Sequence, residues 1–363
     1  MRIVVSGMVA GVPGQGGATW AVLQYVLGLR RLGHDVVLVE PVDHLEDAAP
    51  YFRAVVRSFG LEAALVERRT GRTLGLPRRR LRNGADLLLN ISGLLADDDL
   101  LERIGTRVFL DLDPAFTQLW WEAEGIDPGF DRHDRFVTVG RAIGSSSCTV
   151  PTCGRAWVTT PQPIVLRHWP RAERMVHDAA TTVGHWRAYG SIVHGGVHYG
   201  QKAHSMRGLL GLNECAGSAR FLLALGIHPD ERDDLEALGR HGWRLVDPDR
   251  VAATPAAYQA FVQGSWAELG IAKLGYVASR CGWFSDRSVC YLASGRPVIG
   301  QDTGFSDWLP TGEGLLAFSN VDEAAAALED VRGDYARHRR AARALAEDVF
   351  DSDRVLTRLL SCL

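Results

Sequence analysis

Residues 281–307, CGWFSDRSVCYLASGRPVIGQDTGFSD, place polar side chains at both ends of one short helix–strand unit. Ser285 is a good N-cap for a helix predicted over 286–294, whose first N–H groups attract anions. Arg287 adds a fork-shaped cationic donor. Asp286 would repel a diphosphate and suits a hydroxyl or the helix dipole. An ordinary capped helix explains these residues equally well, so this end of the unit is a candidate anion site.

The other end of the unit, GRPVIGQDTG, predicts a short buried strand over 296–301 that ends at polar residues. Ligands of open parallel sheets bind beyond the carboxyl ends of the strands. Asp302 and Thr303 lie at such an end, followed by Gly304, and the Asp302 carboxylate could accept hydrogen bonds from two sugar hydroxyls. The alternative is an Asx-turn at Asp302.

Strands and helices alternate on both sides of this unit, which predicts parallel sheets covered by helices. The expected strands cover 2–7, 35–41, 86–92, 107–113 and 135–140, then 189–195, 219–225, 243–248, 296–301 and 314–318. Residues 145–185, rich in Ser, Thr and Pro, interrupt the alternation. We therefore expect an α/β protein of two Rossmann-like domains facing a cleft, divided as 1–165 and 166–350, with a final helix in 351–363.

The loop SGMVAGVPGQGGAT after the first strand is rich in glycine. Gly16 and Gly17 permit close backbone approach, and Glu40 after the second strand would suit a ribose. The spacing differs from G-x-G-x-x-G, because Thr19 stands where the third glycine belongs. The loop therefore favours a polar or anionic ligand over NAD.

Further candidates lie elsewhere in the chain. Lys202 stands at a predicted helix start, where a phosphate would bind. Asp113 ends a predicted strand and either caps the next helix or faces the cleft. His133 is a possible proton carrier, although a surface loop explains it equally well. Ser265 and Glu268 match a capping box.

Composition narrows the function. The 363 residues are 46% hydrophobic and 23% charged, with a net charge of −3, which argues against a dedicated nucleic-acid or anionic-membrane partner. The basic run 77–82 is expected to be a solvated loop, and HGGVH at 194–198 is a poor metal motif. No apolar stretch is long enough to cross a membrane, and six scattered cysteines fit reduced thiols. We therefore expect a cytoplasmic protein without a metal or cofactor.

Two phrases resemble the glycosyltransferases of the two-domain GT-B type. GLRRLGHDVVLVE (28–40) is similar to the end of their first helix and their second strand, and CYLASGRPVIGQDTG (290–304) is similar to the region that closes their donor site. Residues 108–118, 151–170 and 281–318 also resemble actinobacterial proteins grouped with glycosyltransferases of families 1 and 4.

The resemblance implies transfer of a sugar from a nucleotide-diphosphate sugar, with the final helix returning to the first domain. It implies a donor site of Gly16, Gly17, Lys202, Trp243 to Val246, Ser285, Asp286, Arg287, Asp302, Thr303 and Gly304. Catalysis would rest on stabilising the leaving diphosphate without a metal, and the expected catalytic residues are Asp113, His133, Lys202 and Arg287.

The chain departs from the GT-B pattern at the catalytic positions. Gly282 and Cys290 stand where many retaining members carry two glutamates, and the loop 7–17 lacks the His or Asp base of many inverting members. The stereochemical outcome and the base stay open, as do a nucleotide-sugar epimerase, an NAD-dependent oxidoreductase and a binding protein without turnover. A small-molecule acceptor, natural-product or nucleoside-like, is expected from the actinobacterial resemblance alone.

Overall fold

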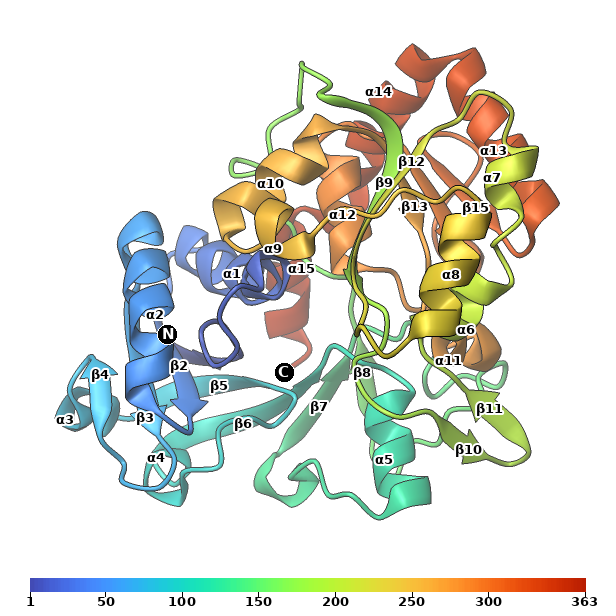
Figure 1. The fold of residues 1–363 in the computed structure, drawn as a ribbon. Helices are drawn as coiled ribbons and strands as arrows, with labels where there is room; N and C mark the ends of the chain where they lie inside the picture. The colour runs from blue at the N-terminus through green and yellow to red at the C-terminus, as the bar shows by residue number, and fades with distance from the viewer.

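The computed structural model describes all residues, 1–363, and contains two large sheets, one in each half of the molecule (Figure 1). The first sheet has the strand order β4-β3-β2-β1-β5-β6-β7-β8, and only β4 is antiparallel to its neighbour. Its strands are β1 (Arg2–Ser6), β2 (Asp35–Val42), β3 (Glu62–Glu67), β4 (Thr73–Gly75), β5 (Ala85–Ile91), β6 (Ile104–Asp111), β7 (Arg135–Thr138) and β8 (Trp157–Thr159).

The second sheet is wholly parallel, with the strand order β12-β9-β13-β14-β15. Its strands are β9 (His177–His185), β12 (Phe221–Gly226), β13 (Ser265–Gly270), β14 (Val298–Gln301) and β15 (Leu315–Phe318). A separate antiparallel hairpin, β10 (Ile192–His194) and β11 (Val197–Tyr199), extends from this half.

Helices cover both faces of each sheet, and the apolar side chains of the inner strands are therefore buried. Around the first sheet lie α1 (Gly16–Arg31), α2 (Leu45–Phe59), α3 (Arg78–Leu81), α4 (Asp98–Leu101), α5 (Phe116–Glu124) and the 3-10 helix η1 (Phe130–Arg132). The second half contains α6 (Lys202–Arg207), α7 (Leu212–Cys215), α8 (Arg232–Arg240), α9 (Pro248–Val251), α10 (Pro255–Gly264), α11 (Leu274–Ser279), α12 (Asp286–Ala293), the 3-10 helix η2 (Phe305–Asp307), α13 (Val321–Gly333), α14 (Tyr335–Leu345) and the π-helix η3 (Ala346–Phe350). None of these helices combines the length and apolar character needed to cross a bilayer.

The last helix, α15 (Ser352–Ser361), packs against α1 of the first half (Figure 1). Gly28 permits this contact, because a Cβ there would lie 2.5 Å from Leu356 Cδ1. The chain crosses between the halves twice, side by side: Ile164 N donates to Phe350 O at 2.8 Å, and Ser352 N donates to Ile164 O at 2.9 Å.

The predicted fold class, two Rossmann-like domains facing a cleft, is confirmed, but three expected elements are wrong. The strand expected over 189–195 is half of a hairpin, and β9 instead occupies part of the expected boundary region. Residues 243–248 form only a bridge between Leu245 and Leu223, since Leu245 is 40% exposed and Pro248 starts α9. The capping box expected at Ser265 is the start of β13, which is buried throughout. The division at 165 and 350 stays a prediction.

Candidate active site

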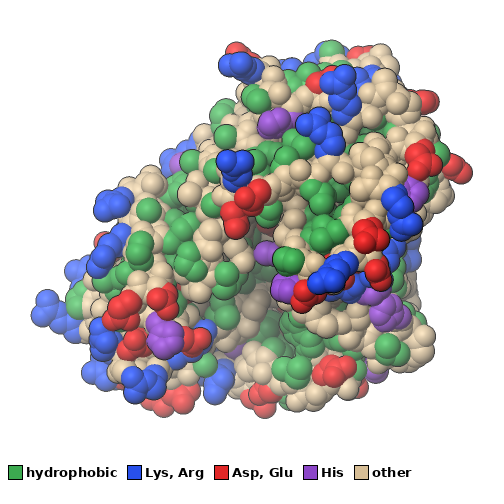
Figure 2. Space-filling model, in the orientation of Figure 1, with side chains coloured by type: hydrophobic (Ala, Val, Ile, Leu, Met, Phe, Trp, Pro, Cys, Tyr) green, Lys and Arg blue, Asp and Glu red, His purple; other side chains and the backbone are tan.

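A cleft with two connected lobes runs between the halves, and Figure 2 shows the hollow from the side of Figure 1. The first lobe, of about 520 Å³, lies among the loop 13–18, the carboxyl ends of β9 and β12, and residues 247–249. The second lobe, of about 490 Å³, lies among α1, the ends of β5 and β6, and residues 271–276. Both lobes are lined by Ala18, Gly184, His185, Asp286 and Arg287. This junction is where one ligand could contact both halves.

Arg287 enters the junction from the start of α12 and is fixed by a buried carboxylate. Ser285 caps the helix as predicted, its Oγ accepting from Arg287 N at 3.2 Å. Arg287 Nε donates to Glu268 Oε1 at 2.5 Å, and Nη1 donates to Val183 O at 3.2 Å. The Glu268 side chain is 0% exposed and its Oε2 has no partner. Glu268 therefore neutralises much of the charge that Arg287 brings to the cleft.

Lys202 is the second cation at this site. Its Nζ is buried and donates to Ile271 O at 2.8 Å. Burial, and then repulsion from Arg287, hold the pKa of Lys202 well below its usual value. An anion bound at the junction would favour the charged form, so binding would be coupled to protonation of this amine.

Two further groups at the junction can exchange protons. Burial raises the pKa of Asp286, which makes its carboxyl group more readily protonated and able to donate to a hydroxyl. Burial, and then the charges of Lys202 and Lys273, lower the pKa of His185. This shift favours the neutral imidazole, and as an exposed lining residue of both lobes His185 can accept a proton.

Asp113 lies in the second lobe, but its carboxylate is fully engaged. Lys273 Nζ lies 3.0 and 2.9 Å from its two oxygens, and the hydroxyls of Tyr189 and Tyr276 donate to it. The Lys273 ammonium lies 4.2 Å from the Tyr189 ring centroid and 5.0 Å from that of Phe116. Asp113 follows the end of β6 in the first half, whereas its three donors belong to the second half. We call these four polar residues the Asp113 latch, because they join the two halves.

The predicted sugar-binding residues 302–304 do not line either lobe. The Asp302 carboxylate accepts from Gly304 N at 3.0 Å and from Ser306 Oγ at 2.8 Å, the Asx-turn that was the alternative. Thr303 Oγ1 donates to Trp283 O, and Gly304 has a left-handed φ of 87°. These residues form a turn that supports the loop before α12.

Three other predicted residues lie outside the lobes. Trp243 is buried against Phe221, with its Nε1 donating to Leu210 O at 2.9 Å. Val246 precedes Asp247, which does line the first lobe. His133 is buried, accepts from Asn90 Nδ2 at 2.9 Å and donates from Nδ1 to Gly129 O at 2.8 Å. Burial also lowers its pKa, so His133 is a structural neutral imidazole away from the cleft.

Residues of the glycine loop line the first lobe, and Gly16 and Gly17 also pack against the second half of the protein. A Cβ on Gly16 would lie 2.2 Å from Thr254 O, and one on Gly17 would lie 2.9 Å from the Tyr258 ring. Glu40 accepts from Ala10 N at 2.8 Å and Gly11 N at 2.6 Å. Its carboxylate therefore holds the loop and is not free for a ribose.

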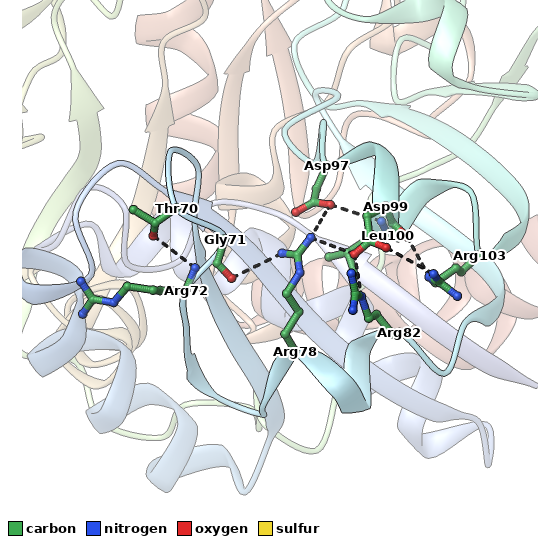
Figure 3. Close-up of polar contacts among 9 residues, drawn as sticks. All are labelled: Thr70, Gly71, Arg72, Arg78, Arg82, Asp97, Asp99, Leu100 and Arg103. Carbon is green, nitrogen blue, oxygen red and sulfur yellow. Dashed lines mark hydrogen bonds and ion pairs between the residues drawn. The ribbon is translucent and has the colours of Figure 1, made fainter.

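The basic run 77–82 is largely neutralised (Figure 3). Arg78 lies 2.8 Å from Asp97 and 3.0 Å from Asp99, and Arg82 lies 2.8 Å from Asp99. Arg103 approaches the same Asp99 carboxylate at 3.3 Å. Hydrogen bonds, first from Arg82 and then from Arg78 and Arg103, lower the pKa of Asp99 to about 2. Part of the predicted solvated loop is thus a short helix, α3, tied to the start of α4.

The sequence reasoning missed Lys273, Tyr276, Tyr189 and His185 at the site. Lys273 and Tyr276 follow β13, and a strand at 265–270 would have placed them at its carboxyl end beside the cleft. His185 ends β9, the strand hidden in the expected boundary region. The omissions of His185, Lys273 and Tyr276 therefore follow from two unrecognised inner strands, whereas Tyr189 begins the stretch 189–195 that was expected to be a strand.

Comparison with solved structures identifies the fold as GT-B. An α-glucosyltransferase in complex with UDP-glucose and DNA containing an abasic site matches with a TM-score of 0.65 at 13% identity, covering 100% of this chain and 99% of that one. HepE of Anabaena in complex with UDP matches with a TM-score of 0.58 at 11% identity, covering 100% of both chains. Sucrose-phosphate synthase of Thermosynechococcus elongatus gives 0.56 at 12% identity, covering 100% and 98%. No protein-family model and no curated protein sequence matches the chain.

One expectation is overturned by these comparisons. The net charge near zero argues against a nucleic-acid partner, yet chains of this fold are solved with DNA that contains an abasic site or an A:G mismatch. The exclusion of a nucleic-acid partner was wrong, because net charge averages over a surface on which local patches can bind.

Proposed function

We propose that this protein is a glycosyltransferase that uses a nucleotide-diphosphate sugar. The observation that carries the proposal is the junction of the two lobes, where Arg287 and the start of α12 meet the loop 13–18 of the opposite half. Lys202 lies in the adjoining second lobe, and its Nζ and Arg287 Nη1 both lie beside Gly184, which lines both lobes. UDP or UDP-glucose in neighbours of the same fold supports uracil as the first base to test.

In this proposal the nucleoside occupies the first lobe and the diphosphate lies at the junction. Lys202, once protonated, and Arg287 stabilise the charge that develops on the leaving diphosphate. Asp286 binds a hydroxyl of the transferred sugar. We propose that these two cations and the positive end of the α12 dipole suffice without a divalent metal.

The acceptor binds in the second lobe, whose lining is more apolar than that of the first. Its hydroxyl oxygen forms the new bond to the anomeric carbon while the bond from that carbon to the diphosphate breaks. His185 takes the hydroxyl proton, and the nucleoside diphosphate leaves. We assign the proton to His185 because the Asp113 carboxylate is already occupied by three donors.

The first experiment is a thermal-shift panel of nucleoside diphosphates, nucleotide sugars, NAD and NADP, since a ligand that binds only the native state raises the melting temperature. We expect a rise with UDP and UDP-glucose that is lost in Lys202→Met. A rise with NAD or NADP alone would refute the proposal. Turnover is then measured as nucleoside diphosphate release with small-molecule acceptors and with DNA. Release that needs no acceptor and yields an altered free sugar would indicate an epimerase.

The role of His185 is tested by His185→Gln. We expect UDP affinity to stay near that of the wild type and acceptor-dependent turnover to fall by roughly 100-fold, the usual contribution of a general base. A variant with full turnover would remove His185 from the mechanism and leave the donor site standing.

A further inference from the structure

A second cavity, separate from the cleft, lies where the chain crosses between the halves. It encloses about 370 Å³, a volume within the range of small-ligand sites. Thr160 and Pro161 of the first crossing and Asp348 and Val349 before the second crossing line it. The remaining wall comes from β8, from Trp308 and from α15. We call this cavity the crossover pocket.

Three arginines line the crossover pocket, and none of them forms an ion pair. Arg141 Nη1 donates to Thr159 O at 2.8 Å, but its Nε is buried without a partner. Arg354 Nη1 reaches only the backbone oxygen of Asp348, at 3.2 Å. The Arg358 guanidinium has no hydrogen-bond partner. Nearby Arg343, by contrast, is paired with Glu347 at 2.6 Å.

This arrangement is unfavourable without an anion. Arg354 and Arg358 are four residues apart on α15, a spacing at which like charges repel. Burial, and then the charge of Arg358, lower the pKa of Arg141. Asp348 is the single carboxylate in the lining, and it pairs with none of the three.

The rest of the lining defines the body of the ligand. The Arg141 guanidinium carbon lies over the Trp308 ring, 5.4 Å from its centroid, and this cation–π contact holds both side chains in the wall of the pocket. Val158, Val349, Val355 and Leu359 supply apolar surface. Arginine forks bind phosphate oxygens in pairs. We propose that the crossover pocket binds a phosphate monoester with an aromatic or apolar body.

The test uses phenyl phosphate and inorganic phosphate as probes, in isothermal titrations of the full chain. We expect phenyl phosphate to bind more tightly than phosphate, and the Arg354→Ala/Arg358→Ala double variant to weaken it by about tenfold for each guanidinium removed. Arg340→Ala, an exposed arginine outside the pocket, serves as the matched control and should bind like the wild type. Lys202→Met should also retain phenyl phosphate binding, which separates this site from the cleft.

Two results would overturn the proposal. One is phenyl phosphate binding that survives in the double variant but disappears in Lys202→Met, which would place the ligand in the cleft. The other is an absence of binding at millimolar concentration in the wild type. Misfolding does not obscure the test, because Arg354 and Arg358 are exposed and their removal relieves repulsion. The melting temperature of the double variant in phosphate-free buffer should therefore not fall.

Discussion

Removal of the Arg287 side chain should destabilise the fold as well as the donor site. In Arg287→Met, the Glu268 carboxylate would stay fully buried without its ion-pair partner, since it pairs with Arg287 at 2.5 Å. The Glu268 Oε2 atom already lacks a hydrogen bond in the intact protein. The variant would also lose the Nη1 contact to Val183 O at the end of β9.

The expected cost follows from the burial of the pair. The Arg287 side chain is 12% exposed and the Glu268 side chain 0%, so solvent screens the interaction little. Breaking a buried pair by removing one partner costs about 3–5 kcal/mol, a large part of the roughly 5–15 kcal/mol that holds a domain folded. Replacing both partners with apolar residues removes the unpaired charge, so Arg287→Met/Glu268→Met should recover most of this loss.

The free energy of unfolding is measured by urea titration, followed by both circular dichroism and tryptophan fluorescence to test whether the transitions coincide. Arg340→Ala is the control for loss of an arginine. A single variant within about 1 kcal/mol of the wild type, or a double variant as unstable as the single one, would refute the reasoning. UDP binding is best compared in the double variant, where the fold is restored and the cation is absent.

Three further outcomes are expected. UDP affinity, measured by titration calorimetry across pH, should fall as pH rises through the depressed pKa of Lys202, and this dependence should flatten in Lys202→Met. The pKa of Asp99 is lowered to about 2 in the folded protein, against about 4 in the unfolded chain. Its contribution to the free energy of unfolding is therefore complete above about pH 4 and is lost as the pH falls toward 2. In Asp99→Asn, acid unfolding followed by circular dichroism should lack this loss. Asp113→Asn should weaken the latch, lowering the melting temperature and increasing the radius of gyration in small-angle scattering.

The sequence predicted the fold class because most strands are runs of Val, Leu and Ile between amphipathic helices. The two central strands of the second sheet escaped detection for a physical reason. β9, HDAATTVGH, is built mainly of small residues, and β13, SWAELG, contains Ser and Glu. Such strands lack the apolar run expected of a buried parallel strand. Several of their polar groups are paired inside the protein: Thr181 Oγ1 donates to Ser265 Oγ at 2.7 Å, and Glu268 binds Arg287.

The candidate site was predictable only where a side chain belongs to a local motif. Ser285, Asp286 and Arg287 were identified from the start of one helix, and Lys202 from the start of another. The latch could not be found in this way, since Asp113 and Lys273 are 160 residues apart and meet only after both sheets form. Asp302 shows the opposite error: the sequence predicted a ligand contact, but the carboxylate accepts hydrogen bonds from residues of its own turn.

The contacts between the halves differ in chemistry on the two sides of the cleft. Beside the first lobe, Trp20 is buried and donates from Nε1 to Pro255 O at 2.8 Å, Gly17 lies against Tyr258, and α15 packs on α1. Beside the second lobe, the charged Asp113 latch lies next to a buried apolar cluster that also joins the halves, in which Phe116 of the first half packs against Tyr276 of the second. Separating the halves on either side would therefore expose apolar surface to water, which is unfavourable. Loss of the latch alone, as in Asp113→Asn, removes the polar contacts on one side and leaves the apolar packing on both.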